Sequence, residues 1–274
     1  MMTDSGTQSF GLTKYWIILK NSAQSNLVYR FDVISGLVAE GLNLVIFSFL
    51  WLSIYRQGNQ IGSYSLGGLI FYFILTRFFA LIIAYTDISR TVSDEIYEGK
   101  IVNYMLKPLS YFGRMISINI GRVAVRLLMF FPLIAVAAYF LRSNFHLTIN
   151  STFFLILIAI AGSLINFLFF YLMGLFAFFL DGTAGISYLG WLAMTFFSGR
   201  MVPLDILPRS LGRVLDYLPF KFVSYVPAQI ILGKFNQVEL LANLALSLAW
   251  LAALWLLARA LYNAGLKRYE SYGI

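Results

Sequence analysis

The sequence has no cysteine, one histidine and few charged residues. Without cysteine, the chain contains no disulfide, no thiolate nucleophile and no cysteine-ligated zinc site. A single histidine excludes a multi-histidine metal site built within this chain. Charged residues make up 12% of the sequence, compared with roughly 25% in soluble domains. So few charges cannot cover the surface of a water-soluble globule, and we expect the chain to fold in lipid.

In place of charge, the sequence is 60% hydrophobic and contains six long apolar runs. About 20 helical residues are needed to cross roughly 30 Å of hydrocarbon. We therefore predict an all-α, polytopic membrane protein in which residues 1–274 form one transmembrane domain. The fifth run is the shortest and contains glycine. The six predicted transmembrane helices are Val33–Tyr55, Leu66–Thr86, Ser117–Leu141, Phe153–Leu180, Gly185–Ser198 and Val238–Tyr262.

Residues 1–32 have a different pattern from the six runs. Leu12, Trp16 and Leu19 recur at helical spacing, followed by Ala23 and Leu27, with polar residues between them. This spacing predicts an amphipathic helix that lies in the membrane interface. A solvated leader is the alternative.

Basic residues indicate the orientation of the chain. Six spans place both termini on one side, and Lys and Arg in short flanking segments are enriched on the cytoplasmic side. The opposite side has only Arg56 and Arg142 in its short loops, whereas the long basic segment 199–237 also lies there. We expect both termini to be cytoplasmic in the cell (inner) membrane. With this topology, the net charge of +8 indicates contact with anionic membrane lipid, not with nucleic acid. The residues that decide the orientation are Lys14, Lys20, Arg30, Arg90, Lys100, Lys107, Arg114, Arg259, Lys267 and Arg268.

The outer segment, residues 199–237, is divided by Pro203, Pro208, Pro219 and Pro227. Two apolar faces within it predict two short re-entrant helices before the sixth span. Irregular backbone at membrane depth requires cover from protein or water. The first face is Leu211, Val214, Leu215 and Leu218, and the second is Phe222, Val223, Val226, Ile230 and Ile231.

The connection between spans two and three, residues 87–116, is polar. Ile88, Val92 and Ile96 lie on one helical face, and Gly99 can end the helix in a left-handed conformation. Arg90, Asp94, Glu95 and Glu98 are expected to project elsewhere. This pattern predicts a cytoplasmic helix with a charged outer face that is suited to docking a soluble partner. A solvated linker is the alternative.

Three charges lie well inside predicted spans, where an ion costs about 2.5–3.5 kcal/mol. Glu40 is the acid, and Arg77 and Arg126 lie at a similar depth in spans two and three. We predict an ion pair between Glu40 and Arg77 or, as a weaker option, Arg126. Its role is either a polar lock on the cytoplasmic end of a pathway or a structural link between helices.

The connection and the outer segment both resemble a known family. Asp94–Ile101 followed by Tyr104–Leu109 resembles the cytoplasmic gate-helix connection of type-2 permeases of ATP-binding-cassette (ABC) exporters. Asp216–Phe220, with Pro227 and Gly233, is similar to the outer re-entrant region of that family. The resemblance extends over nearly the whole chain.

This resemblance implies a subunit without catalytic activity or cofactor that works with cytoplasmic ABC ATPase subunits and a second, identical or related permease chain. Consistently, neither Gly99-Lys100 nor Gly233-Lys234 fits the phosphate-binding pattern G-x-x-x-x-G-K-[ST]. The implied function is export of a hydrophobic or amphiphilic substrate. The implied ATPase-contact residues are Arg90, Asp94, Glu95, Glu98, Gly99 and Lys100, and the implied outer gate comprises Pro203, Pro208, Pro219, Phe220 and Pro227.

Two other functions remain as alternatives. A self-sufficient secondary transporter or channel would move solute without an ATPase. A membrane-embedded lipid-modifying enzyme would need His, Asp or Glu clustered at the interface, whereas this chain has one histidine and scattered acids.

Overall fold

The computed structural model of the chain describes residues 5–28, 30–56, 64–83, 87–105, 109–140 and 146–271. These residues form helices and connecting turns, with no β-strand among them, so the all-α prediction is confirmed for this part of the chain. Each of the six predicted spans overlaps one helix of the described part of the chain. These six helices are α2 (Arg30–Arg56), α3 (Leu66–Ile83), α6 (Tyr111–Phe140), α7 (Ile149–Leu175), α8 (Ala184–Phe197) and α11 (Gln237–Ser271).

Three helical segments in the described part of the chain are long and apolar enough to cross a membrane. They are Leu66–Tyr97, Ile149–Phe178 and Gln237–Arg268. Two shorter apolar helices, Gly41–Arg56 and Ala184–Phe197, accompany them. The composition and these segments are those of a membrane protein.

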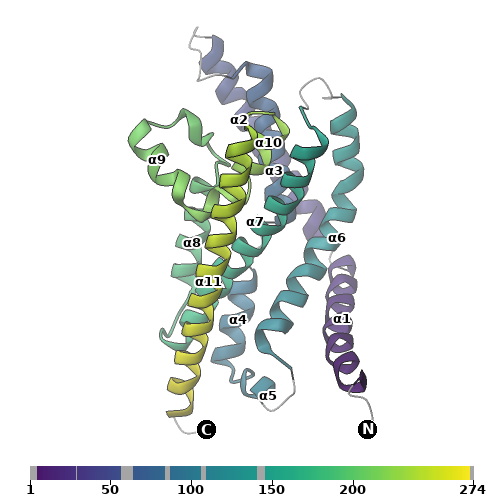
Figure 1. Cartoon of the computed structure of the whole chain (residues 1–274), viewed down its shortest axis with the longest axis vertical. Helices are drawn as coiled ribbons and strands as arrows, with labels where there is room; N and C mark the ends of the chain where they lie inside the picture. Colours follow the sequence, from purple (N-terminus) through teal and green to yellow (C-terminus); the bar gives the residue numbers. More distant parts are fainter. Residues whose placement is uncertain are drawn as a thin grey trace.

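Helix α7 lies at the centre of the molecule and packs along α11 (Figure 1). Glycine permits close approach of other segments at two points on α7. A Cβ atom at Gly174 would lie 2.7 Å from the carbonyl oxygen of Ser89 in α4 (Asp87–Tyr97), and one at Gly162 would overlap the carbonyl group of Phe222. Both approaches bring a backbone carbonyl close to the central helix, and at Gly174 the Val92 side chain lies equally close.

Side chains close the amino-terminal ends of the two helices that form this centre. The Thr148 hydroxyl accepts a hydrogen bond from the Ser151 N–H at 3.1 Å, in a capping box at the start of α7. Asn236 and Glu239 form the reciprocal pair at the start of α11, with distances of 3.0 and 2.8 Å. These pairs satisfy N–H groups that a helix end otherwise leaves without partners.

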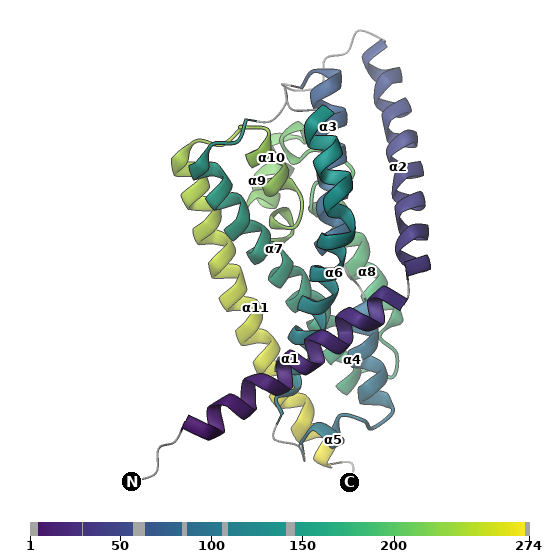
Figure 2. The ribbon, with the colours of Figure 1, turned by 90° about the vertical axis from the view of Figure 1, so that its right-hand side faces the viewer.

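The remaining short elements lie at two opposite ends of the bundle. Helix α4 and α5 (Val102–Met105) lie at the same end as the start of α1 (Ser5–Val28) and the finish of α11 (Figures 1 and 2). The opposite end carries the outer segment. It is built from η3 (Leu204–Ile206), α9 (Arg209–Tyr217), η4 (Pro219–Phe222) and α10 (Tyr225–Ile231). The last short element, η2 (Phe176–Phe178), follows α7 and packs against α4.

Helix α8 is too short to span the bilayer alone. Its 14 residues extend about 21 Å at 1.5 Å per residue, less than the roughly 30 Å of hydrocarbon. The chain turns at Gly199, where φ is +80°, and the Tyr72 hydroxyl donates to the Gly199 carbonyl at 2.6 Å. The outer segment then continues on the side of the molecule where α8 ends.

Helix α1 runs obliquely across the first half of α6 (Figure 2). The Ser22 hydroxyl donates to the Ile118 carbonyl at 3.0 Å, and a Cβ atom at Gly121 would lie 2.7 Å from the Leu19 carbonyl oxygen. The Leu19 backbone therefore lies against α6, and Trp16 of the predicted apolar face is exposed. The predicted helix is confirmed, and its location in the membrane interface stays a prediction.

Candidate functional site: the α4–α5 segment and its links

The apolar face predicted for the connection between spans two and three is buried in the structure. Ile88 and Val92 are fully buried and Ile96 nearly so. Helix α4 packs on α7 and η2 through this face. The segment is therefore a docked helix, not the solvated linker that was the alternative.

The opposite side of α4 and the turn that follows it present charges to the surface. Arg90 and Asp94 approach to 3.8 Å, and both side chains are exposed. Glu98 and Lys100 form a second exposed ion pair, in which the hydrogen bond to Glu98 and its negative charge raise the pKa of Lys100. These four side chains form the exposed charged surface of the segment.

Gly99 creates the turn that carries this surface. Its φ is +72°, the left-handed region that glycine occupies at little cost. The Ile101 N–H donates to the Glu95 carbonyl at 3.2 Å, and the Ile101 side chain is fully buried. The chain therefore folds back under α4 before α5 begins.

The expectation that Glu95 projects to the exposed side with Arg90, Asp94 and Glu98 is wrong. The Glu95 side chain is 13% exposed and forms a two-oxygen ion pair with Arg114 of α6, in which both N–O distances are 2.9 Å. The Tyr111 hydroxyl donates to the same carboxylate at 2.9 Å, and the Arg114 guanidinium lies 4.5 Å from the Tyr104 ring centre. Glu95 thus joins α4 to the first turn of α6.

This joint extends to α1. The Ser110 N–H donates to the Tyr15 hydroxyl at 3.0 Å, and a Cβ atom at Gly113 would lie 2.6 Å from the Tyr15 ring. Since Ser110 and Gly113 flank Tyr111 and precede Arg114, the contacts of α1 and α4 meet on one turn of α6. We name Tyr15, Glu95, Tyr111 and Arg114 the inner joint.

The two intramembrane arginines make different contacts. Arg77 is buried, with its guanidinium 5.2 Å from the Phe47 ring centre. Arg126 donates to the Leu81 carbonyl at 3.0 Å. The side chain of Glu40 lies outside the part of the chain that the structure describes, so its pairing with either arginine stays a prediction.

At the opposite end, the second predicted apolar face is buried. This face comprises Phe222, Val223, Val226, Ile230 and Ile231. The first is only partly covered, because Leu215 is buried whereas Leu211 and Val214 are exposed.

The predicted gate residues also differ in their surroundings. Pro203, Pro219 and Pro227 are buried, and Pro208 is exposed. Phe220 lies edge-on to Phe169 at 5.2 Å between ring centres and contacts Phe197 at 5.8 Å. The outer segment is therefore anchored on α7 and α8 by aromatic contacts.

A polar cluster connects the outer segment to the residues before α3. The Tyr64 hydroxyl donates to Asp205 at 3.1 Å and accepts from Gln229 at 2.6 Å. The Lys234 ammonium lies 3.5 Å from Asp205 and 3.1 Å from the Tyr64 ring centre. Burial lowers the pKa of Lys234, and the Asp205 charge opposes this shift. Burial and Asp205 raise the pKa of Tyr64. We name these four residues the outer cluster.

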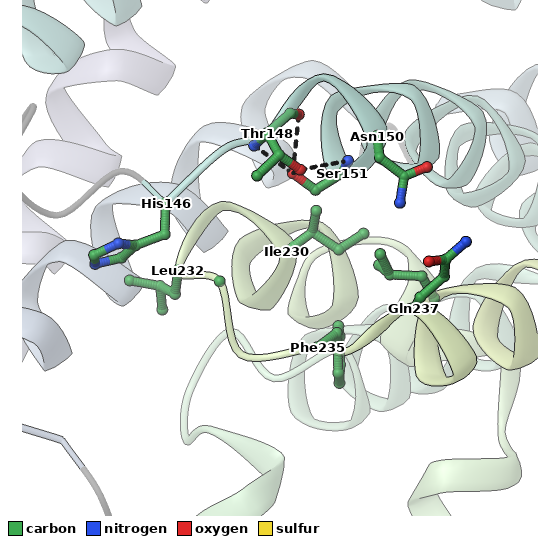
Figure 3. A pocket seen from close by; sticks show the side chains of 10 residues that line it. His146, Thr148, Asn150, Ser151, Ile230, Leu232, Phe235 and Gln237 are labelled. Atoms are coloured by element: carbon green, nitrogen blue, oxygen red, sulfur yellow. Dashed lines mark hydrogen bonds between the residues drawn. The ribbon is translucent and has the colours of Figure 1, made fainter.

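A pocket of about 510 Å³ lies beside this end, between the start of α7 and the turn after α10. Figure 3 shows that two of its polar groups, Thr148 and Ser151, are bonded to each other in the α7 capping box. Gly233, with φ of +66°, brings the turn against His146, and the His146 N–H donates to the Ile231 carbonyl at 3.0 Å. Part of the polar lining of this pocket is therefore already used in holding the α7 end and the turn together.

Comparison with known families agrees with this architecture. The family model described as ABC-2 family transporter protein matches residues 42–273. The chain belongs to this family. No curated protein matches it. The resemblance to type-2 ABC permeases is thereby confirmed, and the chain is an ABC-2 permease, a membrane component for transport.

The inner joint of this ABC-2 permease was not predicted from the sequence, although the α4 sequence contains a signal for it. Glu95 follows Ile88 by seven residues and Val92 by three, spacings that place it on the buried side of the helix. An acid on an apolar face requires a partner. The partner, Arg114, belongs to another helix, and no local pattern identified it. No comparable signal marked Tyr64, Asp205 and Lys234, which are distant in the sequence.

Proposed function

We propose that this chain is the permease subunit of an ABC exporter that moves a hydrophobic or amphiphilic substrate out of the cytoplasm or the inner leaflet. Six spans and two cytoplasmic termini form the subunit, which pairs with a second permease chain in the inner membrane. ATP hydrolysis takes place on separate ABC ATPase subunits, as family membership implies. One observation carries the proposal: an exposed charged surface stands on a helix whose opposite face is buried against the central helix α7.

In this proposal the charged surface is the contact with the ATPase. Asp94, Glu98, Gly99 and Lys100 form the contact, with Arg90 at its edge. Their exposure supports this role, because exposed charges are available for complementary pairing and steer association. Glu95 takes a different role: it holds the segment to α6 through Arg114.

Movement at this surface reaches the bundle by two routes. The buried face of α4 packs on α7 at Gly174, where the Ser89 carbonyl oxygen and the Val92 side chain both lie close to the glycine. The inner joint connects α4 to α6 and α1. A rigid displacement of α4 is therefore delivered to three helices, since packed interiors deform little.

The outer segment forms the exit gate in this proposal, with Pro203, Pro208, Pro219, Phe220 and Pro227 at its bends. Its support is the burial of α10 and the aromatic anchoring of Phe220. Opening would require the contacts of Phe220 and the outer cluster to separate. The second permease chain completes the pathway on the side of α2, α3 and α8.

Pull-down of the detergent-solubilised chain, followed by an ATPase assay of the captured proteins, tests the proposal. We expect capture of an ABC ATPase and at least a fivefold loss of captured activity in the double variant Asp94→Lys/Glu98→Lys. Asp216→Lys is the matched control, because this exposed acid lies on α9 at the opposite end. Capture unchanged by the double variant would refute the assigned contact. Solute transport by the purified chain alone in vesicles would refute the permease function.

A further inference from the structure

A groove between α4 and α8 lies beside the proposed ATPase contact and shares Arg90 and Asp94 with it. Its volume is about 730 Å³, within the roughly 300–1,000 Å³ range of small-molecule sites. Two hydrogen bonds hold its walls together: the Ser89 and Ser187 hydroxyls bond to each other, and the Tyr97 hydroxyl donates to the Leu180 carbonyl at 2.9 Å. The groove is therefore already formed in the free chain.

One end of the groove is the amino terminus of α8. Thr183 is the N-cap residue, and its side chain makes no cap hydrogen bond. It is only 4% exposed, lines the groove, and has no hydrogen-bond partner among the described residues. The first turn of α8 contains no acid, and its N–H groups present positive polarity. Such a helix start favours an anion.

Charged groups on the α4 wall also line the groove. The Arg90 guanidinium lines the groove, and the Asp94 carboxylate lies 3.8 Å from it. Arg90 is exposed at its rim and can turn to a bound anion. Asp94 is the only carboxylate among the described residues that line the groove.

The other end of the groove is aromatic. Tyr188 and Trp191 are 60% and 40% exposed, and their rings stack at 5.7 Å between centres. They follow Ala184 by four and seven residues on the same helix face. The groove is thus polar at the start of α8 and aromatic further along the helix. Tyrosine and tryptophan are enriched at the interface between membrane and water.

We propose that this groove binds a phosphate-bearing, lipid-like amphiphile. Its phosphate lies at the start of α8, between Thr183 and Arg90, and its acyl chain lies along Tyr188 and Trp191. A free phosphate ion would make no use of the aromatic wall, which is why we assign a lipid. The assignment of this amphiphile as cargo rests on the proposed export function, and it names the substrate class.

Photo-crosslinking tests the binding on the chain alone. The probe is phosphatidylglycerol with a diazirine in one acyl chain, added to the detergent-solubilised protein, and labelled peptides are mapped by mass spectrometry. We expect labelling of Tyr188–Trp191 that excess phosphatidylglycerol suppresses. Diacylglycerol with the same chains and inorganic phosphate should each leave the labelling within about twofold of the uncompeted value. Labelling of the exposed α2 residues Leu42, Ile46 and Phe49 serves as the internal control for non-specific lipid contact.

Two variants decide between specific and general lipid contact. Thr183→Val keeps the side-chain shape and removes the hydroxyl, and Arg90→Gln changes an exposed side chain that folding does not require. Each should reduce α8 labelling at least threefold and leave α2 labelling unchanged. Equal competition by diacylglycerol, equal competition by inorganic phosphate, or α8 labelling unaffected by both variants would each overturn the proposal. No ATPase is present, so these outcomes are independent of the pull-down that tests the export function.

Discussion

Replacing Glu95 by Gln tests whether the inner joint holds the α4 helix in place. Glutamine keeps the size of the side chain and part of its hydrogen bonding, and it removes the charge opposite Arg114. A second acid, Glu98, lies three residues away and forms an exposed pair with Lys100. Glu98→Gln is thus a control of the same chemistry at the same end of the molecule.

The magnitude follows from burial. Exposed ion pairs contribute roughly 0–1 kcal/mol, whereas breaking a buried pair costs about 3–5 kcal/mol, because the remaining charge loses its partner. The side chains of Glu95 and Arg114 are 13% and 18% exposed, and Arg114 keeps its contact with the Tyr104 ring. We therefore expect a loss of about 2–3 kcal/mol in the free energy that docks α4.

Hydrogen exchange followed by mass spectrometry measures this loss. Amides of α4 that exchange through local opening should exchange about 30- to 150-fold faster in Glu95→Gln, since each 1.4 kcal/mol corresponds to a factor of about ten. Glu98→Gln should stay within about threefold of the unmodified chain. In Glu95→Gln/Arg114→Gln the loss should be smaller than the sum of the two single losses, because neither variant side chain leaves a charge unpaired. Equal exchange in Glu95→Gln and Glu98→Gln would refute the reasoning.

Three further predictions concern packing at glycine and the outer cluster. Gly174→Ala places a Cβ atom 2.7 Å from the Ser89 carbonyl oxygen and should cost about 1–3 kcal/mol, measured as a lower melting temperature in detergent. Gly185→Ala, with nothing within 4 Å, should not lower it, and equal melting of the two variants would contradict tight α4–α7 packing. Gly121→Leu should release α1 from α6 and speed hydrogen exchange in residues 13–25, and unchanged exchange there would show that this contact is not needed. Asp205→Asn should loosen the outer cluster. Ser224 is fully buried and the chain has no cysteine, so a Ser224→Cys variant provides one thiol, and its labelling rate should rise when Asp205→Asn is added. Slow labelling in both backgrounds would refute its role in holding the outer segment.

Much of the helical framework was predictable from local pattern. Each of the six apolar runs contains a helix, and the burial of Ile88, Val92 and Ile96 matches their spacing. The turn at Gly99 is also as expected, because only glycine occupies its φ of +72° at little cost. Each of these features depends on residues within one or two turns of the chain, so hydrophobic periodicity and residue type are sufficient to predict it.

The sequence did not predict which charged residues form buried ion pairs and which stay exposed. Glu95 and Glu98 belong to one short acidic stretch, yet one is held by Arg114 and the other is exposed beside Lys100. Tyr64, Asp205 and Lys234 converge from positions far apart in the chain. The groove beside α8 likewise needs Ser89 and Thr183 on neighbouring helices. Apolar spacing dictates which residues become helical and which face is buried. The partner of a polar group depends on how distant helices pack against one another, and that is a property of the folded bundle as a whole.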